Sequence, residues 1–369
     1  MERGLFDDAS GEYRETPAAA PGAEAWPLSQ ALAATIAVSA VPGVETDARS
    51  FVERGLHELA ALREGPVYRA TADSEVYYDD NEWIAQDLLD WNAVQPDRAA
   101  VAGASAIFGA VVRAWDGDQA TPCAGGIYWT RAAAVRDRNT VSTVNGALVG
   151  LRLYGLTGRP VYLYWARRML DWVNRCMLSP DGLYWDHVRA DGTVDRTEWS
   201  YNQGSPIAAY LLLYRSTGDR AALARAEALA DGTLRAFDCR WLSEPPEFAA
   251  IFFRHLLELA AVDGNTSYVA AAQAYADAAW NGLRDPGTGL FDAPAGGTTL
   301  LGQAAFVQLY AHLAVTESGG GGRRSPQPGA APTGRGSGGA GAGPARAPRG
   351  PRTPPAPAGR SGRSSRTTR

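Results

Sequence analysis

The chain has 369 residues, and 46% of them are hydrophobic, enough for one large domain or two ordinary ones. Of the 35 basic residues, ten are arginines beyond residue 322, whereas all 40 acidic residues lie at or before Glu317. The net charge of the whole chain is −5, but residues 1–322 carry 25 basic and 40 acidic residues, a net charge of −15. An acidic body argues against nucleic-acid binding, because a phosphate backbone demands a basic surface.

The first ten residues contain acids and no long apolar run, so they do not resemble a signal peptide. No other segment is apolar for long enough to span a membrane. The chain as given is therefore expected to be cytoplasmic, and it would be secreted if its natural start lies further upstream.

The three cysteines, Cys123, Cys176 and Cys239, are odd in number, widely spaced and free of any C-x-x-C pattern. This spacing predicts buried free thiols, with neither a zinc site nor a redox pair. The four histidines show no metal-ligand spacing either, and His255 and His312 lie in apolar helical runs as expected core residues. We therefore expect no metal and no cofactor.

Apolar residues recur at helical spacing in eleven segments, and strand patterns are almost absent, which predicts an all-α fold. The predicted helices span residues 26–40, 48–63, 76–91, 97–114, 139–157, 159–177, 201–217, 219–238, 245–262, 266–283 and 299–315.

Internal repeats show how these helices are paired. Leu153–Gly158 recurs 60 residues later as Leu213–Gly218, and each copy ends a helix at Thr-Gly, where glycine suits the C-terminal cap. A second pattern, glycine followed by apolar and aromatic residues, recurs in longer connections at Gly126–Trp129, Gly182–Trp185 and Gly289–Asp292. Hairpins that alternate tight turns with long aromatic loops predict a closed toroid or a solenoid. A toroid would gather the long loops into a bowl at one end, where loops carry function.

The two ends of the chain differ from the body. Gly4–Asp7 repeats the aromatic loop pattern with no helix before it. Six helix pairs require twelve helices, so our hypothesis is that the chain begins one helix late. From residue 316 to 369 the composition changes to Gly, Pro, Ser, Ala and Arg, which predicts a disordered tail after a domain spanning residues 1–315.

Two adjacent carboxylates, Asp79 and Asp80, open the third predicted helix. Asp80 falls on its apolar stripe, which comprises Tyr77, Ile84, Leu88 and Trp91. Asp79 lies about 100° further round, so the two carboxyl groups can approach to within about 5–6 Å, the separation that a retaining glycosidase needs. Asp is also a preferred residue at helix N-termini, so the pair taken alone fits simple capping better than catalysis.

Three further segments combine aromatic side chains with amides and hydroxyls: Gly125–Trp129, Asn139–Gly146 and Glu198–Gly204. This mixture suits sugar recognition, because rings stack on C–H faces while amides bond hydroxyls. Taken singly, the asparagines fit helix caps, and Trp129 and Trp199 fit core packing.

Taken together and in this order, the segments resemble glycoside hydrolase family 76, the endo-α-1,6-mannanases and their relatives. The resemblance covers residues 4–315 and rests on Tyr78–Trp83, Gly125–Trp129, Asn139–Asn145, Tyr201–Gly204 and the helix Leu300–Leu313. It implies an (α/α)6 barrel that hydrolyses α-1,6-linked mannan with retention of configuration.

The resemblance also implies roles for individual residues. Asp79 would be the nucleophile and Asp80 the acid/base, and the place of Asp80 on the apolar stripe independently predicts a raised pKa. Asn81-Glu82 departs from the apolar pair common in the family. The expected substrate-binding residues are Tyr78, Trp83, Trp129, Asn139, Asn145, Trp199, Tyr201, Asn202 and Gln203.

The expected partner is α-mannan or a manno-oligosaccharide, bound by a monomer. Three alternatives stay open at this point. In a transglycosidase a sugar hydroxyl would replace water, and a sugar-binding toroid would have lost turnover. An unrelated (α/α)6 enzyme, such as an epimerase or an unsaturated uronyl hydrolase, is the rival on fold, although an epimerase would need histidines facing the bowl.

Overall fold

The eleven predicted helices are all present, with ends within four residues of those predicted. The computed structural model describes residues 1–44, 48–293 and 296–319. Two short helices, α1 (Glu2–Leu5) and the 3-10 helix η1 (Trp241–Ser243), accompany them. The long helices are α2 (Ala25–Ser39), α3 (Ala48–Ala61), α4 (Tyr78–Val94), α5 (Arg98–Arg113), α6 (Thr140–Thr157), α7 (Pro160–Cys176), α8 (Tyr201–Thr217), α9 (Arg220–Phe237), α10 (Pro246–Asp263), α11 (Thr266–Gly282) and α12 (Leu300–Gly319).

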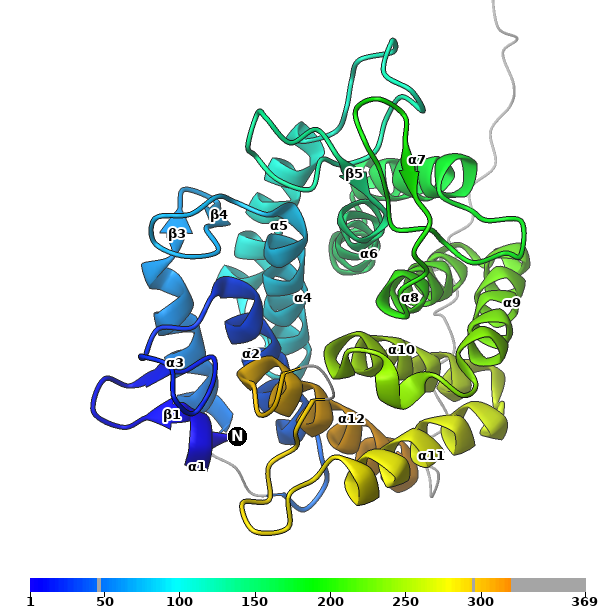
Figure 1. Ribbon diagram of the computed structural model, residues 1–369. Helices are drawn as coiled ribbons and strands as arrows, with labels where there is room; N and C mark the ends of the chain where they lie inside the picture. Colours follow the sequence, from blue (N-terminus) through cyan, green and yellow to red (C-terminus); the bar gives the residue numbers. More distant parts are fainter. Residues whose placement is uncertain (45–47, 294–295, 320–369) are drawn as a thin grey trace, which may run out of the picture. The chain divides into compact units, whose positions relative to one another are not determined.

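Six helices form a closed inner ring, in which α2, α4, α6, α8, α10 and α12 each pack on the next and α12 packs back on α2 (Figure 1). The other five long helices, α3, α5, α7, α9 and α11, pack against the outside of this ring. The closed ring confirms the (α/α)6 barrel and excludes the solenoid. Among the described residues no sixth outer helix lies beside α12 and α2, and the hypothesis of a further helix before residue 1 stays a prediction.

The difference between the two layers follows from the sequence. The inner helix α6 is buried without interruption from Thr140 to Leu151, because neighbours cover this part on every side. The outer helix α7 buries only one face, as an amphipathic surface helix does; this face consists of Tyr162, Ala166, Met169, Leu170, Trp172 and Val173.

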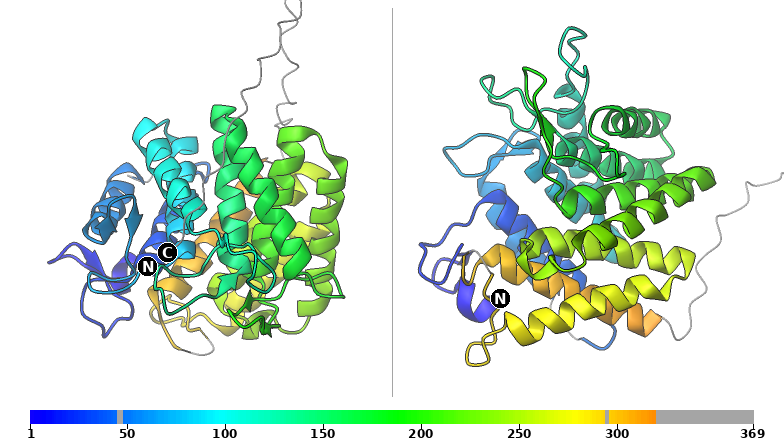
Figure 2. Two further views of the ribbon diagram at one scale, coloured as in Figure 1. Left: turned by 90° about the horizontal axis from the view of Figure 1, so that it is seen from above. Right: turned by 45° about the vertical axis from the view of Figure 1, so that its right-hand side comes forward.

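All six inner helices begin at the same end of the ring, and the connections alternate as predicted. At the opposite end, Gly158, Gly218 and Gly264 end α6, α8 and α10 in the left-handed conformation, with φ of 66°, 75° and 77°. The long connections, residues 62–77, 114–139, 177–200 and 283–293 with 296–299, gather at the end where the inner helices begin (Figure 2). This end is the bowl that a toroid predicts.

The strands in the described residues are two residues long; β1 and β2 precede α2, and the others lie in the long connections. β1 (Phe6–Asp7) pairs with β2 (Glu12–Tyr13), and β3 (Arg63–Glu64) pairs with β4 (Val67–Tyr68). β5 (Arg138–Asn139), β6 (His187–Val188) and β7 (Val194–Asp195) form a third antiparallel sheet in that order. In this sheet Asn139 lies opposite His187, so two long connections meet directly in front of α6.

The repeated aromatic loops are each fixed to an inner helix through backbone atoms. The Gln203 side chain on α8 accepts from Tyr184 N (2.8 Å) and donates to Tyr184 O (2.9 Å). Gln303 on α12 bonds the backbone of Phe291 in the same way. At the third loop, Thr143 Oγ1 on α6 accepts from Ile127 N at 3.0 Å. The pattern therefore recurs because each loop docks on the first turns of the following inner helix.

Cys123 and Cys176 form a disulfide, and Cys239 is exposed, so the prediction of three buried free thiols is wrong. The two bridged residues are 53 positions apart, which hides the pairing from the sequence. The connection after α5 folds back to the end of α7 and brings their Cα atoms to 6.1 Å, within the range that a disulfide spans.

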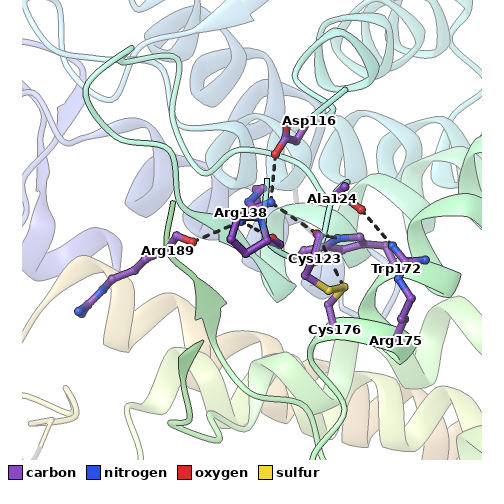
Figure 3. The surroundings of a disulfide bond; sticks show 9 residues. Asp116, Cys123, Ala124, Arg138, Trp172, Arg175, Cys176 and Arg189 are labelled. Atoms are coloured by element: carbon purple, nitrogen blue, oxygen red, sulfur yellow. Dashed lines mark hydrogen bonds and ion pairs between the residues drawn. A yellow bond between two sulfur atoms is a disulfide. The ribbon is translucent and has the colours of Figure 1, made fainter. Parts of the chain in front are cut away.

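The disulfide belongs to a hydrogen-bonded anchor for the connection between α5 and α6 (Figure 3). The carbonyl of Cys123 accepts from Trp172 Nε1 at 2.9 Å, and that of Ala124 accepts from Arg175 at 3.0 Å. Arg138, which is fully buried, pairs with Asp116 at 3.0 Å and also donates to the carbonyl of Arg189. These contacts fix the residues that lead into α6.

Reducing the disulfide is expected to lower the free energy of unfolding by about 2–4 kcal/mol, because a loop of this length gains chain entropy when it is released. Chemical unfolding with and without dithiothreitol measures the change. The Cys123→Ser, Cys176→Ser double variant should show the reduced value under both conditions, and Cys239→Ser should match the wild type. Equal unfolding midpoints for the oxidised and reduced wild type would contradict the prediction.

A network of charged side chains crosses the ring beyond its first turns. Asp90 on α4 pairs with Arg152 on α6 and Arg254 on α10, each at 2.7 Å. His255 is buried and lies 3.0 Å from Glu258, which confirms it as a satisfied core residue. His312 differs from the prediction, because its Nε2 finds no partner among the described residues; burial lowers its pKa to about 4.

The predicted tail begins within the last turn of α12, which runs to Gly319, and the rest of it, from residue 320, lies outside the described residues. None of the described helices is long and apolar enough to cross a lipid bilayer.

Candidate active site

A cavity of about 440 Å³ opens at the end of the ring where the inner helices begin. Its walls combine carboxylates with aromatic rings, and His187 is the one basic residue among those that line it. The lining residues are Glu24, Trp26, Ala70, Tyr77, Asp79, Asp80, Trp83, Trp129, Asp137, Asn139, Val141, Asp186, His187, Tyr201 and Phe248.

The two adjacent aspartates lie in the first turn of α4, on the cavity wall. The helix begins after Tyr77, whose backbone is extended and whose side chain makes no capping bond. Tyr78 N donates to Trp129 O at 2.9 Å, which aligns the start of α4 with the connection between α5 and α6. Asn81 is fully buried, and its amide donates to the carbonyls of Tyr68 and Tyr77. The backbone carrying the aspartates is thus held from two sides.

Asp79 is held in a mixed environment. Burial raises the pKa of its carboxyl group, while the Trp129 indole, which donates to Asp79 Oδ2 at 3.2 Å, lowers that pKa by favouring the carboxylate. The charge on Asp186 raises it again. Asp79 Oδ1 is buried and has no hydrogen-bond partner among the described residues. Asp79 therefore has one oxygen fixed by a donor and one oxygen unpaired.

Asp80 lies in the more unfavourable place for a negative charge. Burial, the adjacent Asp79 and the nearby Glu24 all raise its pKa well above the ordinary value, as its place on the apolar stripe predicts. The pair titrates as a unit, and the indole donor makes Asp79 the member that ionises first. Between the two proton losses Asp79 is a carboxylate and Asp80 is a carboxylic acid.

The cavity brings together six of the eleven side chains that the sequence predicts for the site. Besides Asp79 and Asp80 these are Trp83, Trp129, Asn139 and Tyr201. Trp129 also packs against Tyr77, with ring centroids 4.8 Å apart, and Tyr201 packs against Phe248 at 4.1 Å. Two aromatic pairs thus stand on different walls.

The structure gives the other five side chains different surroundings. Gln203 is fully buried, and its amide is used by the backbone of Tyr184 and by the carbonyl of Trp199. Trp199 packs edge-on against Phe248, with centroids 5.4 Å apart. Asn202 is fully buried and donates to Asp186 Oδ1 at 2.9 Å, so it orients a residue of the cavity wall.

The remaining two of these five lie inside the ring or against its core. Asn145 is fully buried one turn and a half into α6, and its amide has no partner among the described residues. Tyr78 packs against the main hydrophobic core, where burial raises its pKa. None of these five side chains lines the cavity.

Four charged groups of the wall, Glu24, Asp137, Asp186 and His187, were not predicted from the sequence. Asp186 Oδ2 lies 2.9 Å from His187 Nδ1, and its Oδ1 accepts from Asn202 and, at 3.4 Å, from the Tyr201 hydroxyl. One signal was available. Asp186 directly follows the aromatic pattern that ends at Trp185, and Asp7 and Asp292 close the same pattern in two other loops.

No three His, Cys, Asp or Glu side chains gather in a way that could hold a metal ion, over the part of the chain that the structure describes. The cavity places two adjacent carboxyl groups between aromatic side chains. Paired carboxyl groups can cleave a glycosidic bond, and aromatic rings can stack on sugar faces.

The chain belongs to glycosyl hydrolase family 76, whose family model matches residues 5–285. Among curated relatives, mannan endo-1,6-alpha-mannosidase DCW1 of Saccharomyces cerevisiae is 33% identical over 126 residues, which is 31% of this chain and 27% of that protein. The Candida albicans protein of the same name is 32% identical over 137 residues, 34% of this chain and 29% of that protein. The matches thus span less than a third of these relatives.

Solved structures share the fold over most of the chain. A glycoside hydrolase family 76 mannosidase from Bacteroides thetaiotaomicron VPI-5482 superposes with a TM-score of 0.76 at 24% identity, covering 86% of this chain and 96% of that one. An inactive α-1,6-mannanase variant of Salegentibacter sp. HEL1_6, with two adjacent aspartates changed to asparagine, is in complex with α-1,6-mannotriose. It superposes with a TM-score of 0.72 at 20% identity, covering 85% and 96%.

Proposed function

We propose that the chain is a retaining glycosidase that cleaves α-1,6-mannosidic linkages in mannan. The observation that carries the proposal is that the two aspartates at the cavity have unequal environments. Asp79 accepts a hydrogen bond from Trp129, whereas burial and the charges of Asp79 and Glu24 all raise the pKa of Asp80. A retaining enzyme needs this combination of a nucleophilic carboxylate with a protonated carboxylic acid.

The reaction follows in two steps. Asp79 attacks the anomeric carbon while Asp80 gives its proton to the departing glycosidic oxygen, which leaves a mannosyl ester on Asp79. Asp80, now ionised, removes a proton from an incoming water that displaces the ester, and the second inversion restores the original configuration. The aromatic pairs of Trp129 with Tyr77 and of Tyr201 with Phe248 would hold the sugar faces.

The identity of the sugar is supported by the relatives. The curated ones are named mannan endo-1,6-alpha-mannosidases, and a related structure carries α-1,6-mannotriose. Incubation with linear α-1,6-mannan tests the proposal, with reducing ends and the first anomer formed followed by NMR. The α-anomer should appear first. Initial release of the β-anomer would overturn retention, and hydrolysis of α-1,2- or α-1,3-mannan in preference would overturn the linkage.

The hydrogen bond from Trp129 to Asp79 gives a pH prediction. Trp129→Phe keeps an aromatic ring at this position and removes the indole N–H donor. The pKa of Asp79 should therefore rise, and the acid limb of the kcat/KM profile should move up by about one pH unit. A plot of kcat/KM against pH for both proteins measures it. Trp83→Phe is the matched control, because this tryptophan also lines the cavity and makes no bond to Asp79. Equal acid limbs for Trp129→Phe and wild type would contradict the role of the indole.

We further propose that the protein works as a monomer in an oxidising compartment outside the cytoplasm. The Cys123–Cys176 bridge supports this location, because disulfides persist where thiols are not kept reduced. Fractionation of the native cells followed by thiol labelling tests it, and a cytoplasmic pool with both cysteines alkylated would overturn it. Light scattering measures the oligomeric state.

A further inference from the structure

We propose that His187 is a positioning residue of the cavity, whose imidazolium fixes the orientation of Asp186 and offsets the negative charge that Asp186 directs toward Asp79. The inference rests on the proposed role of Asp79 as the nucleophile. It assigns a task to the one basic side chain on a wall that otherwise carries five carboxyl groups.

The geometry around Asp186 leaves its carboxylate a single orientation. Oδ1 accepts from Asn202 at 2.9 Å and from the Tyr201 hydroxyl at 3.4 Å, and Oδ2 faces His187 Nδ1 at 2.9 Å. Asn202 and Tyr201 belong to α8, whereas His187 belongs to β6, so the carboxylate bridges two elements. Removing the imidazole would release Oδ2 and let Asp186 turn about its remaining bonds.

His187 is itself held in a charged position. Its Nε2 lies 3.9 Å from Oδ2 of Asp137, the residue directly before β5. The side chain of His187 is 15% exposed and that of Asp137 is 29% exposed. The hydrogen bond to Asp186 raises the pKa of the imidazole, and the charges of Asp186, Asp137 and Asp195 raise it further, against the effect of burial. The imidazole therefore keeps its positive charge to higher pH than an ordinary histidine does.

The electrostatic consequence reaches the nucleophile. The charge on Asp186 raises the pKa of Asp79, and a cation in contact with Asp186 reduces the field that Asp79 experiences. The charged groups near His187 are Asp186 directly before β6, Asp137 directly before β5 and Asp195 opposite His187 on β7, and the Tyr201 hydroxyl on α8 bonds Asp186. Without the imidazolium, this wall carries only acids, and both Asp79 and Asp80 should hold their protons to higher pH.

Two substitutions separate charge from orientation. His187→Asn keeps an N–H donor close to the position of Nδ1 but removes the positive charge. Its acid and alkaline limbs of kcat/KM should both move up by about half a pH unit or more, with the plateau within about twofold of wild type. His187→Ala loses the donor as well, so it should show the same shift together with a plateau lower by about tenfold.

His57→Asn is the matched control, because His57 is exposed on α3, away from the cavity, and its profile should coincide with that of the wild type. Thermal unfolding verifies that all variants are folded. A profile of His187→Asn that coincides with the wild type would overturn the inference.

A measurement that does not need turnover keeps this inference separate from the proposed function. NMR titration of the imidazole should give His187 a pKa above the ordinary value for histidine, and Asp186→Asn should lower it. If the wild type releases no sugar from α-1,6-mannan, the proposed function fails, while the titration still reports whether the pair exists. If the pKa of His187 lies below the ordinary histidine value in an active enzyme, the inference fails and the proposed function stands.

Discussion

Asparagine in place of Asp79 is expected to reduce kcat on α-1,6-mannan by at least about 10⁴-fold, because an amide cannot form the covalent intermediate. Asparagine at Asp80 is expected to cost about 10²–10⁴-fold on the same substrate, since only proton transfer is lost. Initial rates of reducing-end release with each purified variant measure both effects. Asp97→Asn is the control, because Asp97 caps the exposed start of α5 and its substitute keeps an acceptor for that cap.

The two roles can be told apart chemically. An aryl α-mannoside with an acidic phenol needs little protonation on departure, so Asp80→Asn should recover most of its first step with that substrate and accumulate the glycosyl-enzyme. Azide added to Asp80→Asn should then give the α-mannosyl azide, whereas azide added to a Gly or Ala variant of Asp79 should give the β-azide by direct displacement. The opposite pattern would exchange the roles, and wild-type rates in both asparagine variants would remove the site altogether.

The ring of helices was predictable from the sequence because each layer has a local signature. The outer helices show an apolar stripe, and the Thr-Gly ends mark where two helices turn back on each other through a left-handed cap. The repeated aromatic loops indicated which connections are long. Closure of the ring follows from the repeated geometry rather than from any single residue.

The site was predictable where it is contiguous in sequence and not where it is assembled from separate loops. Asp79 and Asp80 lie next to one another, so one helical turn defines their relation. The relation of Asp137, Asp186 and His187 to that pair depends on the pairing of β5 with β6, which joins connections about 50 residues apart. The disulfide was hidden for the same reason. The amide of Gln203 bonds loop backbone, and in sequence such an amide cannot be told from one that bonds a sugar.

Removing the Asp90 carboxylate is expected to lower the free energy of unfolding by about 3–5 kcal/mol, because it leaves two largely buried guanidinium groups without their common partner. Asp90 bonds Arg152 and Arg254 at 2.7 Å each, and the three side chains are 16–19% exposed. Asp90→Ala in urea unfolding at pH 7 measures the change. Burial opposes the charge, yet the two guanidinium groups outweigh it and hold the pKa of Asp90 below its ordinary value. The stabilisation is therefore present above the unfolded-state pKa and is lost as the pH falls through the folded one.

Asp87, one turn earlier on α4, is the matched control. Its substitution should raise the free energy of unfolding at pH 7, whereas that of Asp90 should lower it. It is 3% exposed, its Oδ2 has no partner among the described residues, and burial together with the charge of Asp90 raises its pKa well above the ordinary value. The unfolded chain thus ionises Asp87 before the folded one does, so stability falls as the pH rises above the unfolded pKa of about 4. Asp87→Asn removes that loss and should raise stability at pH 7, with the gain vanishing below about pH 4. Destabilisation of the protein at pH 7 by similar amounts in Asp87→Asn and Asp90→Ala would contradict the prediction. Any change to a buried carboxylate in this part of the ring would then destabilise the fold, whether or not the carboxylate forms ion pairs.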